Sequence, residues 1–280
     1  MKNVMQLKAK MKNISKEIRI SAQLVLQNYM LERLLERISL SDYRDNFILK
    51  GGFLIASMVG LDTRATMDMD VTITGEPVNT ENIRTIFEKL VQIQLGDDIS
   101  FSFKSISEIR EGDDYDGYRV HLIGYFPPMA VPLKLDITTG DKITPKEIKY
   151  EYKTMLDDTK IIPVLAYNLE TILAEKLEAI ISRGDQTTRP RDYYDVYILC
   201  KLQGSNINPQ HLSEALTATA NKRGVSENMK GYRRIIETVR VSESMNNEWE
   251  KYQDSFDYAK GITLEDTCDA VIELMEKLKL

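Results

Sequence analysis

Two aspartates, Asp68 and Asp70, stand two residues apart in a segment that alternates between polar and apolar side chains. A period of two is typical of a β-strand, in which residues i and i+2 project from the same face. Both carboxylates are therefore expected on one face, with their Cα atoms about 6.5 to 7 Å apart. Carboxylates at this separation can share metal ions, so the pair is a candidate Mg²⁺ site.

A third carboxylate, Asp136, lies in a second alternating segment whose apolar residues are expected to face the core. Nucleotidyl and phosphoryl transfer commonly use two Mg²⁺ ions roughly 3.5 to 4 Å apart, which need hard oxygen ligands. The sequence thus predicts two Mg²⁺ ions held by Asp68, Asp70 and Asp136. The alternative is a solvated strand face, because exposed aspartates are common. The depletion of aspartate in strands favours the metal site.

Gly51 and Gly52 follow the short apolar run 47–49 and precede a segment with helical patterning, 53–59. Glycine lets a phosphate approach the backbone, and a helix N-terminus offers free N–H groups and a positive dipole end. We therefore expect the triphosphate of an NTP to rest here. An ordinary turn is the alternative, and the position of the glycines before the aspartate pair favours the phosphate role.

Lys176 lies opposite the apolar stripe of a predicted helix, and Asp192 and Asp195 are three residues apart on one face of the next helix. Lys176 could bind a phosphate as a compact positive charge. It could equally form an interhelical ion pair with one of these aspartates, and the two roles are compatible.

The composition argues against several other kinds of chemistry. Only two histidines and two cysteines occur among 280 residues, so a His-rich zinc site or a disulfide framework is hard to build. No segment approaches the roughly 18 to 20 apolar residues of a membrane span, and residues 1–19 do not resemble a signal peptide. We therefore expect a cytoplasmic protein with no membrane partner.

The net charge of −6 means that contact with RNA requires a local basic patch. The run from Lys222 to Arg240 is the most basic stretch of the chain. A solvated helix face is the other interpretation of this run.

The patterning predicts an α+β fold followed by helices. Strands are expected over 67–74, 99–106, 118–126 and 131–138, and the run 47–49 is either a strand or the end of a helix. Helices are expected over 18–40, 53–59 and about 79–93, with a turn at Glu111–Asp114. Strand patterns end near Pro163. Helices are then expected over 168–183, 190–202, 208–221, 228–260 and 263–279, which gives two domains, 1–162 and 163–280.

Five short motifs follow one another along the chain: Leu49–Gly52, Arg64–Asp70, Lys134–Asp136, Ala174–Leu177 and Arg191–Val196. In order and spacing they resemble the AbiEii/AbiGii abortive-infection toxin family over roughly residues 20–205. This family is similar to DNA polymerase β-like nucleotidyltransferases in its catalytic domain, and it supplies the toxin of bacterial toxin–antitoxin and phage-defence pairs. The resemblance implies a nucleotidyltransferase domain with a mixed sheet over 1–162 and a helical domain over 163–280.

The resemblance also implies an activity, the transfer of nucleotides from an NTP to RNA, with the tRNA 3′ end as the acceptor. Mg²⁺ would be held by Asp68, Asp70 and Asp136, and an antitoxin encoded nearby would be the cognate partner. The functional lysine of the family's third motif corresponds to Lys176. The aspartates of its fourth motif correspond to Asp192 and Asp195.

One residue departs from the wider pattern. Many nucleotidyltransferases have Ser or Thr directly after the glycines, where this chain has Phe53. The hydroxyl that would bind a terminal phosphate is missing at this position, so Ser57, Lys50 and Arg64 are the candidate substitutes.

Two other functions stay open. The same carboxylates would serve a nucleotidyltransferase or kinase that acts on a small molecule. A catalytically silent NTP-binding module is the third possibility, and Phe53 is the residue that motivates it.

Overall fold

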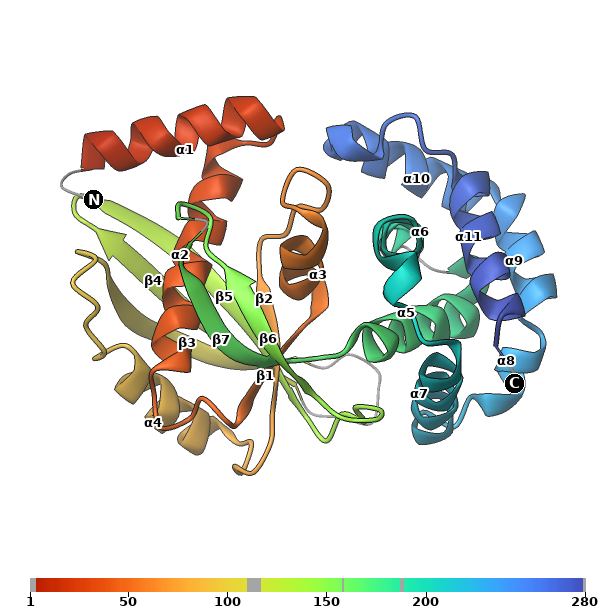
Figure 1. The fold of residues 1–280 in the computed structure, drawn as a ribbon, viewed down its shortest axis with the longest axis horizontal. Helices are drawn as coiled ribbons and strands as arrows, with labels where there is room; N and C mark the ends of the chain where they lie inside the picture. The colour runs from red at the N-terminus through yellow and green to blue at the C-terminus, as the bar shows by residue number, and fades with distance from the viewer. Residues whose placement is uncertain (1–3, 110–116, 158, 187–188, 279–280) are drawn as a thin grey trace. The chain divides into compact units, whose positions relative to one another are not determined.

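The computed structural model describes residues 4–109, 117–157, 159–186 and 189–278. The chain divides into two compact units (Figure 1). The sheet unit comprises Met1–Asp141 and Ile148–Ala166, and the helical unit comprises Lys142–Glu147 and Tyr167–Leu280. The turn predicted at 111–114 lies outside the described residues. Strand β7, Ile161–Ala166, runs across the predicted boundary at 162/163.

A seven-stranded mixed sheet forms the centre of the sheet unit, in the order β3-β4-β5-β2-β1-β7-β6. The neighbours β1/β7 and β2/β5 are parallel, and the other neighbouring pairs are antiparallel. The strands are β1 Phe47–Lys50, β2 Met69–Ile73, β3 Ser100–Ile109, β4 Gly117–Phe126, β5 Met129–Thr139, β6 Ile148–Lys153 and β7. This architecture, with helices following it, confirms the predicted α+β class.

Alternation along the strands separates a core face from an open face. In β5 the side chains of Val131, Leu133, Leu135 and Ile137 are buried, while Lys134 is exposed and Asp136 is half-buried. The period of two therefore places Asp136 away from the core, as the sequence predicts.

Four helices complete the sheet unit: α1 Val4–Ile18, α2 Ala22–Ser39, α3 Gly51–Val59 and α4 Thr80–Leu90. Helix α2 packs on β5 and β7, α3 on β1 and β2, and α4 on β3 (Figure 1). Asn79 caps α4 by accepting a hydrogen bond from the Asn82 amide, 2.9 Å away. The sequence analysis missed α1, β6 and β7. In β7, Pro163 lacks the amide donor expected of a strand residue, which masks the pattern.

The helical unit begins with α5 Leu169–Arg183, which Asn168 caps and Gly184 ends, as predicted. The elements after it are α6 Pro190–Gln203, α7 Pro209–Lys222, α8 Ser226–Lys230, α9 Tyr232–Arg240, α10 Glu243–Ser255 and α11 Leu264–Glu276, with 3₁₀ turns η1 Gly184–Gln186, η2 Gly204–Asn206 and η3 Asp257–Ala259. The prediction of one continuous helix over 228–260 is wrong, because three helices, α8, α9 and α10, occupy this range. The segment breaks at Gly231 and at Ser242, whose hydroxyl caps α10. No helix in the described ranges has the length and apolar character needed to cross a membrane.

Candidate active site

Four charged side chains form a row across the centre of the sheet. Lys50 on β1 is paired in register with Asp70 on β2, Asp70 with Asp136 on β5, and Asp136 with Arg119 on β4. Directly paired residues of neighbouring strands project from the same face, with Cβ atoms about 5 Å apart. The sheet therefore brings together two of the predicted carboxylates, and it adds an arginine that the sequence analysis missed.

Arg119 binds Asp136 through two hydrogen bonds. Its Nε donates to Oδ1 at 2.7 Å and its Nη2 donates to Oδ2 at 2.6 Å. The hydrogen bond to Asp136 raises the pKa of Arg119, and the charges of Asp136, Asp68 and Asp70 raise it further, while desolvation opposes the shift. All three predicted carboxylates therefore act on one cationic group.

Asp68 immediately precedes β2 and is half-buried. The hydroxyl of Thr66 donates a hydrogen bond of 3.2 Å to its Oδ1. In the described ranges, no three His, Cys, Asp or Glu side chains stand in an arrangement ready to hold a metal ion. Both oxygens of Asp136 already accept hydrogen bonds from Arg119.

The glycine turn contacts the carboxylates directly. The Gly52 amide, at the N-terminus of α3, donates a hydrogen bond of 3.3 Å to Asp70 Oδ2. Gly51 has a φ of +66°, and a Cβ at this position would stand 2.0 Å from the same oxygen. Only glycine lets the backbone approach Asp70 this closely. A Cβ on Gly52 would meet Thr66 Oγ1 at 3.0 Å and Arg64 Nη2 at 3.2 Å.

Lys50, predicted to bind the nucleotide, lies at the end of this row and forms an ion pair with Asp141 at 2.6 Å. The hydroxyl of Thr138 donates to the same carboxylate oxygen at 2.6 Å. Asp141 was also missed by the sequence analysis. The only local signal for it is an aspartate directly after the glycine that follows β5.

Phe53 is a core residue, 1% exposed, and its ring stacks on Tyr152 of β6 with centroids 5.5 Å apart. The position after the glycines therefore faces the interior of the sheet unit. The Ser57 hydroxyl donates to the Leu54 carbonyl at 2.7 Å and lies 2.9 Å from the Tyr150 hydroxyl. Arg64 is 6% exposed and donates to the Ala65 carbonyl.

Lys176 forms the interhelical ion pair that the sequence left open. Its Nζ lies 2.5 Å from Asp192 Oδ1 and 2.9 Å from Asp195 Oδ2, so α5 and α6 are joined by one cation and two carboxylates. The Asp195 side chain is fully buried. These three predicted site residues belong to the helical unit, whereas the row belongs to the sheet unit.

The basic stretch Lys222–Arg240 is largely compensated by acidic neighbours. Arg223 pairs with Glu178 and Arg233 with Glu276. Lys230 and Arg240 also have carboxylate partners within 3.3 Å. The stretch is therefore a weaker candidate for binding RNA than its sequence suggests.

A different basic surface occurs on α1. Lys8, Lys12 and Lys16 are exposed at intervals of four residues and so share one side of the helix, here called the α1 lysine face. None of the three has an ion-pair partner in the described part of the chain. They line a groove of about 490 Å³ together with apolar side chains that include Leu26 and Met129.

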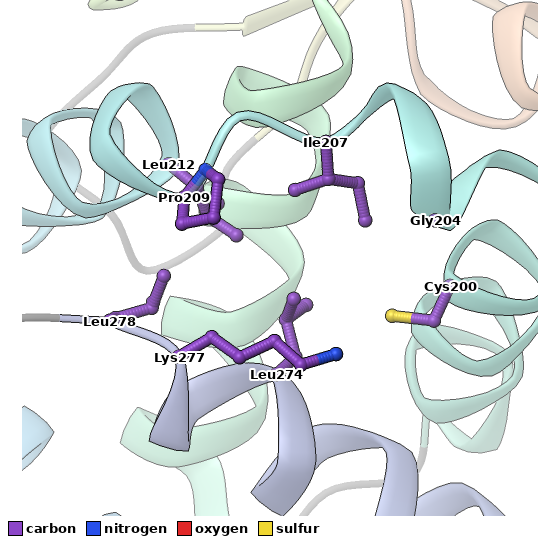
Figure 2. Close-up of a pocket in the computed structure, with 8 residues that line it drawn as sticks. All are labelled: Cys200, Gly204, Ile207, Pro209, Leu212, Leu274, Lys277 and Leu278. Atoms are coloured by element: carbon purple, nitrogen blue, oxygen red, sulfur yellow. The ribbon is translucent and has the colours of Figure 1, made fainter.

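The helical unit contains a small apolar pocket of about 80 Å³. Figure 2 shows the Cys200 thiol of α6 and the Lys277 amine among its lining side chains, together with Ile207, which follows η2, and Leu274 of α11. Burial raises the pKa of Cys200 to about 11. None of the residues predicted from the sequence to belong to the active site lines this pocket.

Comparisons with known proteins identify the family and similar folds. Residues 33–271 match the family model described as nucleotidyl transferase AbiEii toxin of a type IV toxin–antitoxin system. A crystal structure described as a nucleotidyltransferase from Helicobacter pylori is similar with a TM-score of 0.53 and 16% identity, over 92% of this chain and 97% of that one. The structure of JHP933 from the same species has a TM-score of 0.50 and 17% identity, over 92% and 94% of the two chains. These two likenesses concern the fold. No curated protein matches significantly.

Proposed function

Since the chain belongs to the AbiEii family of nucleotidyltransferase toxins of type IV toxin–antitoxin systems, we propose that the row on its sheet is the nucleotidyl-transfer site. The observation that carries the proposal is the register of Lys50, Asp70, Asp136 and Arg119 on four adjacent strands. The row places two carboxylates between two cations, at the turn where Gly51 lets the backbone approach Asp70. As the toxin of such a pair, the protein acts with a cognate antitoxin.

The three carboxylates have the chemical type that Mg²⁺ prefers, although in the described ranges they do not stand ready to hold an ion. Asp68, Asp70 and Asp136 supply hard carboxylate oxygens, and their combined charge already stabilises the cation of Arg119. These three residues would hold two ions. When bound, such ions activate an attacking hydroxyl and neutralise the charge on the leaving pyrophosphate.

The remaining groups at the turn would position the NTP. The amides at the N-terminus of α3 and the Lys50 amine are suited to phosphate, because both present positive charge to it. Ser57, on α3, and Arg64, which follows α3 in the chain, remain candidates for binding the NTP. Since Phe53 faces the core, we infer that the terminal phosphate is bound by these cations and amides and not by a hydroxyl after the glycines.

For Lys176, Asp192 and Asp195, the catalytic role rests on the family motifs. Their closed ion-pair cluster supports a structural role in joining α5 to α6. A lysine that holds two helices in place and later exchanges a carboxylate for a phosphate would satisfy both interpretations.

We further infer that the acceptor is RNA, with the tRNA 3′ end as the specific candidate. The α1 lysine face supports this, because three lysines with no ion-pair partner among the described residues, in an otherwise acidic protein, suit a phosphate backbone. The apolar side of α1 is turned inward, with Leu7 and Met11 buried, so it is not available for insertion into a membrane. The α1 double variant, Lys8→Gln/Lys12→Gln, removes two of these charges. The C-terminal double variant, Arg233→Gln/Arg234→Gln, removes the same charge elsewhere and is its matched control.

The decisive experiment incubates the protein with Mg²⁺, α-labelled NTP and total bacterial RNA, and compares wild type with Asp68→Ala and Asp136→Asn. We expect labelled tRNA with wild type only, and growth arrest on expression of wild type only. Asp45→Ala is the control, because Asp45 is an exposed aspartate of the same unit, away from the row. Full labelling by either site variant would reject the site. Label on a small metabolite, or from γ-labelled NTP alone, would indicate the small-molecule enzyme or kinase. NTP binding with no labelled acceptor would indicate the silent module.

A further inference from the structure

The contact between Arg119 and Asp136 is unusual for a residue expected to hold a metal ion. Both carboxylate oxygens accept hydrogen bonds from the guanidinium, at 2.7 and 2.6 Å. This bidentate geometry is the strongest form of an arginine–carboxylate ion pair. The side chains are only partly shielded, 36% exposed for Arg119 and 18% for Asp136, so the pair can open without uncovering the core.

Arg119 also lies within the field of all three aspartates. Its pKa is raised by the hydrogen bond to Asp136 and by the charges of Asp136, Asp68 and Asp70. A group stabilised by three carboxylates occupies a strongly negative part of the surface, which is also where a divalent cation would be most stable. Arg119 and a metal ion therefore compete for the same electrostatic position and for the oxygens of Asp136.

Building on the proposed function, we propose that Arg119 is the resident counter-ion of the transfer site and is released from Asp136 when the nucleotide binds. The planar guanidinium that now spans the two oxygens of Asp136 is equally suited to two oxygens of a phosphate. In the absence of NTP, Arg119 holds Asp136 in place and limits divalent-cation binding. With NTP, Arg119 moves to the triphosphate and leaves Asp136 open. Arg119 is thus a residue that binds nucleotide and regulates access of metal to the carboxylates.

This exchange couples the two ligands. A nucleotide that takes Arg119 away from Asp136 makes cation binding more favourable, and by linkage the cation makes nucleotide binding more favourable by the same factor. The arrangement would keep the free toxin poor in metal and would load both ligands together.

The test measures Mn²⁺ binding by the electron paramagnetic resonance signal of free Mn²⁺, with and without a non-hydrolysable NTP analogue. It needs neither RNA nor turnover. We expect Arg119→Gln to bind Mn²⁺ roughly tenfold more tightly than wild type in the absence of nucleotide. The enhancement of Mn²⁺ affinity by the analogue should be roughly tenfold smaller in Arg119→Gln than in wild type, because no guanidinium remains to be displaced.

Two further variants keep the test decisive. Arg84→Gln is the matched control, because Arg84 is an exposed arginine on α4 that pairs with Glu88 outside the row, and its Mn²⁺ affinity should equal that of wild type. Arg119→Lys keeps the positive charge but lacks the planar guanidinium, and it should give a smaller increase in Mn²⁺ affinity. This variant provides the test if Arg119→Gln folds poorly. Unchanged Mn²⁺ affinity in both Arg119 variants would overturn the inference while leaving the transfer site standing. If wild type with the analogue binds no Mn²⁺, or binds it equally after Asp68→Ala, the proposed metal site itself fails and this inference fails with it.

Discussion

Gly51 is the position where a single methyl group tests the site most directly. Its φ of +66° lies in the left-handed region, and an added Cβ would stand 2.0 Å from Asp70 Oδ2 and 2.5 Å from its Cγ. Contacts below 3.0 Å do not persist in real structures, so Asp70 must retreat by about 1 Å or the turn must distort. Gly51→Ala therefore combines a backbone cost with the displacement of a proposed metal ligand.

The backbone cost of alanine in the left-handed region is about 1 to 2 kcal/mol. For a chain of this size, each kcal/mol lowers the melting temperature by roughly 2 to 4 °C. Displacement of a reacting or ligating group by about 1 Å lowers activity by roughly 100-fold. We therefore expect Gly51→Ala to lose a modest amount of stability and nearly all transfer activity.

Gly96 provides a matched control. It has the same φ of +66°, and nothing lies within 4 Å of the position that a Cβ would occupy there. Gly96→Ala should lose similar stability in thermal melts but keep its labelling of RNA by α-labelled NTP. If the two variants label RNA equally well, Asp70 does not act from its present position, and the argument for the row is refuted.

Three more predictions concern the other charged and buried groups. Lys176→Met should lower the free energy of unfolding by about 3 to 5 kcal/mol, because the buried carboxylate of Asp195 would lose the charge of the Lys176 ammonium. A loss below about 1 kcal/mol in urea denaturation would contradict the structural role. The α1 double variant should weaken RNA binding and reduce the slope of log K, the RNA association constant, against log salt concentration by about 1 to 2. The C-terminal double variant should change neither quantity. Equal effects of the two variants in filter-binding assays would contradict RNA binding by the α1 lysine face. Since burial raises the pKa of Cys200 to about 11 and only the thiolate reacts, its alkylation should accelerate about tenfold for each pH unit between pH 8 and 10. A rate, followed by mass spectrometry, that levels off at about pH 9 would contradict the raised pKa.

The sequence by itself determined the features that depend on neighbours along the chain. The alternation around Asp136 identified the core and open faces of β5, because side chains alternate with a period of two in any strand. The caps at Asn79 and Asn168 predicted helix starts, because a capping side chain bonds to an amide only two or three residues away. The five motifs likewise indicated the family that residues 33–271 match.

Local sequence signals were misleading where the role of a residue depends on neighbours that are distant in sequence and close in space. Pro163 obscured β7, which pairs with β6 and reaches β1 only through its last two residues. Phe53 suggested a missing phosphate contact, and in the fold it is a core residue stacked on Tyr152. The arginines of the C-terminal basic stretch implied a positive surface, yet the carboxylate of Glu276 on α11 neutralises Arg233.

Only the tertiary structure decided which charges share the site. Arg119 is 17 residues from Asp136 in sequence, and Lys50 is 91 residues from Asp141. No period or motif along the chain specifies that β5 lies between β4 and β2, since strand order is set by how the whole sheet buries its apolar face. The register of those strands then places a cation against each end of the carboxylate pair, because residues paired across a sheet project from the same face whatever their separation in sequence.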